Sequence, residues 1–202
     1  SVVSSVTSRM AGGVEVGTGF ESHGFANNDK GTVKIDVIAA TADNGLVVDA
    51  GFAGEKSKQL PIRIAILGDG RLAFDPKQNV APEVSELLPT LARGLLVGHQ
   101  PAAGVKWSTP AMEPATGNRS YVIGAASDTS ATISITGDAK TTGPQGFDRH
   151  EEASLTYQPK LSAPLRYDTR IRVRRNGLNG PEVDDVHLTA TLASDTFAPA
   201  GS

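Results

Sequence analysis

The chain has 202 residues, of which 39% are hydrophobic, 5% aromatic and 20% charged, and its formal net charge is −3. A chain of this length can bury a core without covalent staples. The weak negative charge argues against a general nucleic-acid binder, which needs clustered Lys and Arg for phosphate contacts. The absence of cysteine excludes disulfides, thiolate metal sites and a cysteine nucleophile.

In the first part of the chain, apolar and polar residues alternate, as in a strand with one buried face. Residues 32–40 show this pattern, and the turn residues 43–45, which include an Asn-Gly pair, lead into a return strand. Residues 61–67 repeat the alternation, and the turn at 68–70 leads into a further short strand. The polar residues 12–29 are predicted to form a long loop.

Residues 82–97 break this pattern, because their apolar residues recur at spacings of three and four. That spacing predicts a helix with one apolar stripe. Pro82 suits a first helical turn, whereas Pro89 removes a backbone donor inside the segment. We therefore expect a kink or two short helices, with the stripe packed on the concave face of a sheet.

Alternation returns in the second part of the chain, at residues 130–136, 170–174 and 185–194. Residues 101–118 are predicted to be an extended crossing loop before a strand at 119–125. Residues 138–150 are predicted to be another long polar loop.

Many strands joined by short polar turns indicate an antiparallel sheet. The fold class predicted from the sequence is therefore mainly β, with an antiparallel meander sheet that forms a half-barrel or a barrel-like structure. One interrupted helical segment packs on the sheet. Residues 1–202 are predicted to form a single domain with its helical insertion near residues 82–97.

Catalytic motifs are absent from the sequence. There is no Gly-x-Ser-x-Gly elbow and no phosphate-binding loop ending in Gly-Lys-Ser/Thr. An enzyme would need at least two of four polar side chains to converge in a cleft. These four are Asp185, His187, His150 and Glu152. We predict that the protein is not an enzyme, has no metal site and needs no cofactor.

Four aspartates are interpreted from their neighbours in the sequence. Asp43, Asp69, Asp138 and Asp148 are interpreted as turn residues, because Asp bonds to the local backbone in turns.

The most specific polar feature is a stripe of arginines at Arg170, Arg172 and Arg174, which share one strand face. Such a stripe can form a positive ridge for carboxylates, phosphates or a partner protein. It can equally be a solvated face that pairs with acids on neighbouring strands, and Glu151, Asp184 and Asp185 are the candidate acids. We favour the ion-paired interpretation.

The predicted sheet would have a concave apolar face that one helix covers only in part. That face can be filled by the core, occupied by a ligand or closed by another subunit. Since the lining is aliphatic, an apolar small molecule or lipid would suit it. The predicted ligand-lining residues are Val37, Val48, Ile64, Leu88 and Leu91.

The hairpin at residues 32–52, the helical segment at 82–97 and the strands at 165–194 follow one another as meander, helix and meander. This layout resembles the half-barrel envelope proteins that carry or sense lipoproteins and lipids in the bacterial periplasm. The resemblance implies a hydrophobic cavity under helices and a lipid or lipidated partner.

From these features we expect a non-catalytic exported protein, periplasmic or on the cell surface, that binds a hydrophobic ligand or a lipidated partner. The Ser/Thr/Gly-rich texture and the start at Ser1 favour a processed, exported chain. No apolar run is long enough to span a bilayer. The alternative is a structural subunit of an envelope or surface assembly, which would self-associate or bind an envelope protein. A hydrolase-type enzyme is the third hypothesis.

Overall fold

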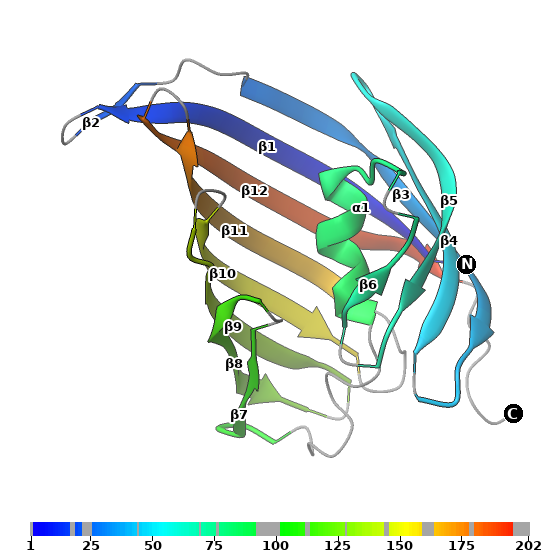
Figure 1. The fold of residues 1–202 in the computed structure, drawn as a ribbon. Coiled ribbons are helices and arrows are strands. Elements are labelled where there is room, and N and C mark those ends of the chain that lie inside the picture. The colour runs from blue at the N-terminus through cyan, green and yellow to red at the C-terminus, as the bar shows by residue number, and fades with distance from the viewer. Residues whose placement is uncertain are drawn as a thin grey trace, which may run out of the picture.

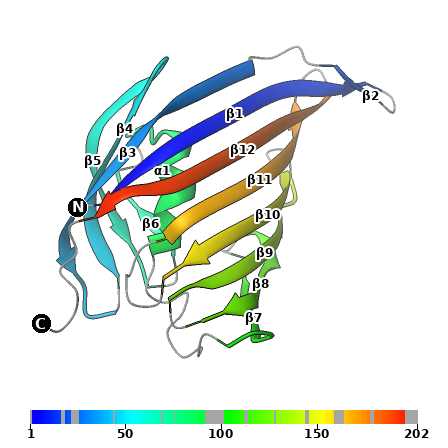
Figure 2. The same cartoon turned by 180° about the vertical axis from the view of Figure 1, so that it is seen from behind.

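A computed structural model describes residues 2–16, 19–21, 26–43, 45–68, 70–75, 77–91, 102–111, 114–127, 129–143, 146–158, 164–177 and 180–195. The described residues are mainly β, as the sequence predicts, and their strands form one antiparallel sheet that does not close on itself. Figure 1 shows the curved sheet with its helix on the concave side, and Figure 2 shows the convex side.

The first half of the sheet contains β1 (Val2–Val16), β2 (Gly19–Glu21), β3 (Ala26–Ala40), β4 (Leu46–Gly54), β5 (Lys58–Ile66) and β6 (Leu72–Ala73). The second half contains β7 (Lys106–Pro110), β8 (Thr116–Ala126), β9 (Ala131–Lys140), β10 (Phe147–Tyr157), β11 (Pro164–Gly177) and β12 (Gly180–Asp195). Between the halves lie α1 (Pro82–Leu87) and the 3₁₀ helix η1 (Leu88–Leu91).

The two ends of the chain meet in the middle of the sheet. The strand order is β6-β5-β4-β3-β1-β12-β11-β10-β9-β8-β7, and β2 pairs only with β1. Each half is thus a meander, and the β1–β12 pairing joins the halves along a register from Val2 with Asp195 to Val14 with Glu182. The outermost strands are β6 and β7, and the helical segment lies between them in sequence and on the concave side of the sheet (Figure 1).

Interruptions of the strand register accompany the curvature. The register shifts at Val37/Ala39 between β3 and β4 and at Ile123/Ala126 between β8 and β9. A β-bulge bends its strand and increases the local twist. These shifts help the long strands to wrap around one side of the helix, which produces an inner and an outer face.

The helical segment has the predicted interruption. Pro82 stands in the first turn of α1, and the segment continues as the 3₁₀ helix η1, which contains Pro89. A proline inside a helix removes a backbone donor, so a change of helix type at this point is expected. The apolar stripe is buried against the sheet at Val84, Leu87, Leu88 and Leu91. The remaining predicted helical residues, 92–97, lie outside the described residues.

The core lies between this helical segment and the inner face. Its largest buried apolar side chains come from both halves of the sheet and from the helices; they include Ile35, Ile64, Leu87, Leu88, Ile123, Ile133, Leu155 and Leu188. Each fully buried aliphatic side chain of this size contributes about 1.5–3 kcal/mol. Among the residues that the structure describes, no helix has the length and apolar character to cross a membrane.

The predicted loops were largely wrong. The segment predicted as a loop at 12–29 contains the end of β1, β2 and the start of β3. The crossing loop at 101–118 contains β7 and the start of β8, and the loop at 138–150 contains parts of β9 and β10. Small or polar residues such as Gly12, Thr109 and Arg149 stand on the inner side of these strands. They interrupt the apolar alternation by which a half-buried strand is recognised.

Candidate functional site

The five residues predicted to line a ligand cavity lie together on the concave side. Val48 and Ile64 belong to β4 and β5 and Leu88 belongs to η1; all three have 0% exposure. Val37 and Leu91 pack in the same cluster. None of the five lines any of the three cavities described below.

A groove lies on the inner face beside the start of α1, where the helix leaves the sheet uncovered. It has a volume of about 570 Å³. Its floor is formed by β1, β12, β11 and β10, the long strands that extend past the helix in Figure 1. The apolar residues in its lining are Met10, Ala11, Pro82, Phe147, Ile171, Val173 and Val186. The polar and charged ones are Ser85, Glu86, Arg149, Arg175, Asp184 and Asp185. We call this cavity the apolar groove.

Sequence reasoning missed the apolar groove for a specific reason. Phe147 was assigned to a loop, and the strand that contains Met10 was not predicted at all. Met10 and Val186 are register partners in the β1–β12 pair, and Val186 is in turn the partner of Ile171. The groove is therefore formed by pairing between the two ends of the chain, which local sequence patterns do not reveal.

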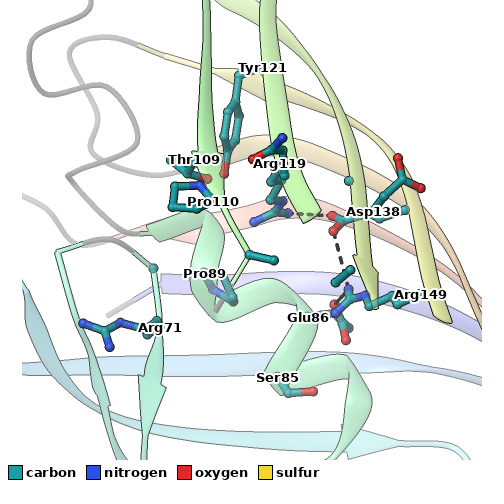
Figure 3. Close-up of a pocket in the computed structure, with 16 residues that line it drawn as sticks. Arg71, Ser85, Glu86, Pro89, Thr109, Pro110, Arg119, Tyr121, Asp138 and Arg149 are labelled. Carbon is teal, nitrogen blue, oxygen red and sulfur yellow. Dashed lines mark hydrogen bonds and ion pairs between the residues drawn. The ribbon is translucent and has the colours of Figure 1, made fainter. Parts of the chain in front are cut away.

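A second cavity, of about 260 Å³, lies between the helix and strands β8–β10. Figure 3 shows Arg119 and Arg149 reaching from the sheet toward the helix that carries Ser85 and Glu86. Arg119 Nη2 donates to Glu151 Oε1 at 2.6 Å. Arg149 Nη2 lies 3.1 Å from Glu86 Oε2 and 3.5 Å from Glu151 Oε2. We call this cavity the ion-pair pocket.

A glycine lies beneath the Arg119–Glu151 contact. Gly137 of β9 is the register partner of Arg119 on β8 and of Glu151 on β10. A Cβ atom at Gly137 would lie at ordinary van der Waals distance from both side chains, 3.4 Å from Arg119 Cγ and 3.5 Å from Glu151 Oε2. The two charged side chains therefore meet above Gly137, two strands apart, and pack closely over it.

Aromatic side chains also lie against Arg119. The Trp107 and Tyr121 rings stack with centroids 5.0 Å apart and an interplanar angle of 5°. The Arg119 guanidinium carbon lies 5.7 Å from the centroid of Tyr121, within the range of a cation–π contact. The single tryptophan of the chain thus belongs to the wall behind the ion-pair pocket.

Burial and charge shift the pKa values of three groups here. Burial alone would lower the pKa of Arg119, but the neighbouring Glu151 outweighs it and raises the pKa above its usual range. Burial raises the pKa of Tyr167, and the Glu151 charge adds to this effect. Burial also raises the pKa of Glu86, although Arg149 opposes the change. Arg119 is therefore a fixed cation, while ionised Glu86 is only partly compensated.

The acidic residues of this region correct several predictions. Glu151 was a candidate partner for the arginine stripe on the opposite face, which is wrong, because it is buried on the inner face with 5% exposure. Asp138 and Asp148 lie within β9 and β10 rather than in turns. The glycine before Asp138 resembled a turn signal, but it lies within β9, between Arg119 on β8 and Glu151 on β10. Asp43 does lie in a turn, and Asp69 lies outside the described residues.

On the outer face, the arginine stripe is placed as predicted. Arg170, Arg172 and Arg174 are exposed on β11 and alternate with Ile171 and Val173, which are buried and half-buried. Arg172 and Asp185, one of the predicted acids, form a bidentate pair with distances of 2.7 and 3.0 Å.

Asp184, another predicted acid, pairs with a different arginine. Its Oδ2 accepts a hydrogen bond from Arg175 Nη1 at 2.6 Å. Both residues line the apolar groove, so this pair belongs to the inner face. Of the two acids Asp184 and Asp185, it is Asp185 that supports the ion-paired interpretation of the stripe.

The four polar residues considered for catalysis, Asp185, His187, His150 and Glu152, do come together, in a depression of about 350 Å³ on this outer face. His150 Nδ1 lies 2.7 Å from Asp138 Oδ1, and its Nε2 lies 3.6 Å from Glu152 Oε1. The hydrogen bond with Asp138 raises the pKa of His150.

These contacts form an exposed network of ion pairs along the depression, in which the His150 and Glu152 side chains are 53% and 68% exposed. Within the described part of the chain, no group of three or more His, Asp or Glu residues is arranged to hold a metal ion. The absence of enzymatic activity stays a prediction.

Comparisons with family models, with curated proteins and with solved structures find no match to this chain. The resemblance to half-barrel lipid carriers therefore stays a prediction.

Proposed function

We propose that this protein is a non-catalytic, exported carrier that binds a hydrophobic ligand, or the lipid part of a lipidated partner, on the concave face of its open sheet. The observation that carries the proposal is the apolar groove. It offers about 570 Å³ beside the helix, a volume in the usual range for small-molecule sites. Its apolar side chains are aliphatic apart from Phe147, and they share the lining with polar and charged side chains at Ser85, Glu86, Arg149, Arg175, Asp184 and Asp185.

Two features of the groove suit an aliphatic chain. Met10, Val173 and Val186 are only half-buried, so a bound chain would remove their apolar surface from water. Methionine adapts its shape to irregular apolar partners. The groove is also continuous with polar groups at Glu86 and Arg149, which suits a ligand with an apolar body and a polar end.

The alternative, a subunit that assembles by adding strands at a sheet edge, is less well supported. The edge strand β7 carries Lys106 and Pro110. At the other edge, β6 pairs with β5 only at Ala65 and Ile66, and β5 carries Pro61 beside a register shift. Lysine, proline and bulges at an edge discourage pairing with another chain.

Native mass spectrometry of protein purified from its source, followed by denaturation of the same sample, tests the proposal. We expect a monomer with an adduct of a few hundred daltons that is lost on denaturation, a mass on the scale of one lipid chain. A series of subunit multiples without a small adduct would contradict the carrier and favour the assembly subunit.

A further inference from the structure

The apolar groove and the ion-pair pocket share three lining residues, Ser85, Glu86 and Arg149. The Glu86–Arg149 ion pair therefore stands where the apolar groove meets the ion-pair pocket. A ligand whose chain lies in the groove would present its polar end at this ion pair.

In the ion-pair pocket, Glu86 is the acceptor that a ligand could replace, because it receives fewer hydrogen bonds than Glu151. Glu151 is contacted by Arg119 at 2.6 Å, by Arg149 at 3.5 Å and by the Tyr167 hydroxyl at 3.4 Å. Glu86 has one contact of this kind among the described residues, the 3.1 Å contact with Arg149. In addition, Arg119 Nε is buried and has no hydrogen-bond partner among the residues that the structure describes.

The positions of the two carboxylates also make Glu86 easier to displace than Glu151. Glu151 is held in the middle of the sheet on β10 and is almost fully buried, whereas the Glu86 side chain is 26% exposed and stands on a short helix. Burial also raises the pKa of Glu86, so its charge is only partly stabilised where it lies. Turning Glu86 toward solvent would leave two guanidinium groups facing one carboxylate.

We propose that the ion-pair pocket receives the anionic head group of the ligand, which takes the place of Glu86 on Arg149. This inference rests on the proposed function and specifies the ligand class: a long aliphatic chain that ends in a carboxylate or a similarly small anion. Hydrogen bonds between charged partners are about twice as strong as neutral ones, and arginine matches a carboxylate in a bidentate fashion.

Three ligands with one aliphatic chain and different head groups test this inference. Hexadecanoate, hexadecanol and hexadecylamine carry a negative, a neutral and a positive head at a pH of about 8. Dissociation constants are measured by isothermal titration calorimetry on the full chain. We expect hexadecanoate to bind about tenfold tighter than hexadecanol, and hexadecylamine to bind most weakly.

Two variants locate the head-group site. Glu86→Gln removes the competing carboxylate, so it should tighten hexadecanoate binding about threefold to tenfold and leave hexadecanol unchanged. Arg149→Gln should abolish the preference for hexadecanoate. Arg63→Gln is the matched control, because Arg63 pairs with Asp49 at an exposed position of β5 and should change none of the three constants. Should Arg149→Gln fail to fold, Glu86→Gln decides the test.

The outcomes separate the two proposals. Equal binding of hexadecanol and hexadecanoate, or tighter binding of hexadecylamine, would overturn the head-group inference and leave the carrier function standing. If none of the three ligands binds, both the carrier function and the head-group inference fail.

Discussion

Glu151 is the residue on which the polar part of the interior depends. Its carboxylate lies between Arg119 and Arg149 and also accepts from the Tyr167 hydroxyl. The two partly buried cations are compensated by this buried anion, together with Glu86 at Arg149. Removing one partner of a buried ion pair costs more than the pair contributes, because the remaining charge stays desolvated.

Glu151→Ala should therefore lower the free energy of unfolding by about 2–3 kcal/mol, a value reduced from the fully buried case because both arginines reach solvent in part. Glu152→Ala is the matched control on the next residue of β10. It points to the outer face and should change stability by less than about 0.5 kcal/mol. Urea denaturation of both variants measures the difference, and equal losses would contradict the assignment of Glu151 to the interior.

His150 gives the outer face a pH dependence of stability. Its hydrogen bond with Asp138 raises its pKa in the folded protein above the ordinary value. A raised pKa means that the charged imidazole stabilises the fold. This contribution is complete below the unfolded-state pKa of about 6.5 and is lost as the pH rises through the folded-state value.

His150→Asn lacks this charge, so wild type should exceed the variant in stability by more at a pH of about 5.5 than at about 8.5. Urea denaturation at the two pH values measures the difference. The prediction fails if the stability difference between wild type and variant is the same at both.

At the scale of elements, the helical segment is stabilised by the burial of its apolar stripe, since it is too short to be a stable helix by itself. α1 and η1 together make only a few turns, too short to be stable alone in water. Leu87 and Leu88 are buried against the sheet with 1% and 0% exposure. The position of the segment, and hence the boundary of both inner cavities, depends on these contacts.

Leu88→Ala should lower the free energy of unfolding by about 3 kcal/mol, because it leaves a cavity between η1 and the sheet. Leu60→Ala, at a position on β5 with 69% exposure, should change it by less than about 0.5 kcal/mol. Thermal and urea denaturation compare the two. A similar loss in both variants would mean that η1 does not pack on the sheet as described.

The elements that could be predicted from the sequence are those with an apolar inner face. The β3–β4 hairpin and the helical stripe show regular apolar spacing, because their inner residues meet the core. β1 and β10 do not, since β1 places Ser4 and Ser8 inward and β10 places Arg149 and Glu151 inward. The strands around the ion-pair pocket were therefore hard to recognise because they carry polar inner residues.

At the scale of the whole molecule, the open sheet produces the inner cavities. β1 and β12 pair in the middle of the sheet, so the groove combines Met10, Phe147 and Val186 from distant parts of the chain. The helix covers the aliphatic part of the concave face and leaves the long ends of β10–β12 and β1 open (Figure 1). No local pattern could have predicted this site, because it depends on the β1–β12 register.

The most direct test of the account is contact between a ligand and Met10, which lines the apolar groove and is one of two methionines in the chain. Protein labelled with ¹³C at the methionine methyl groups is titrated with hexadecanol, and the Met10 signal is assigned from its loss in Met10→Leu. We predict that the Met10 methyl signal shifts and saturates with the ligand. Binding of hexadecanol without any change in that signal would contradict the assignment of the groove as the ligand site.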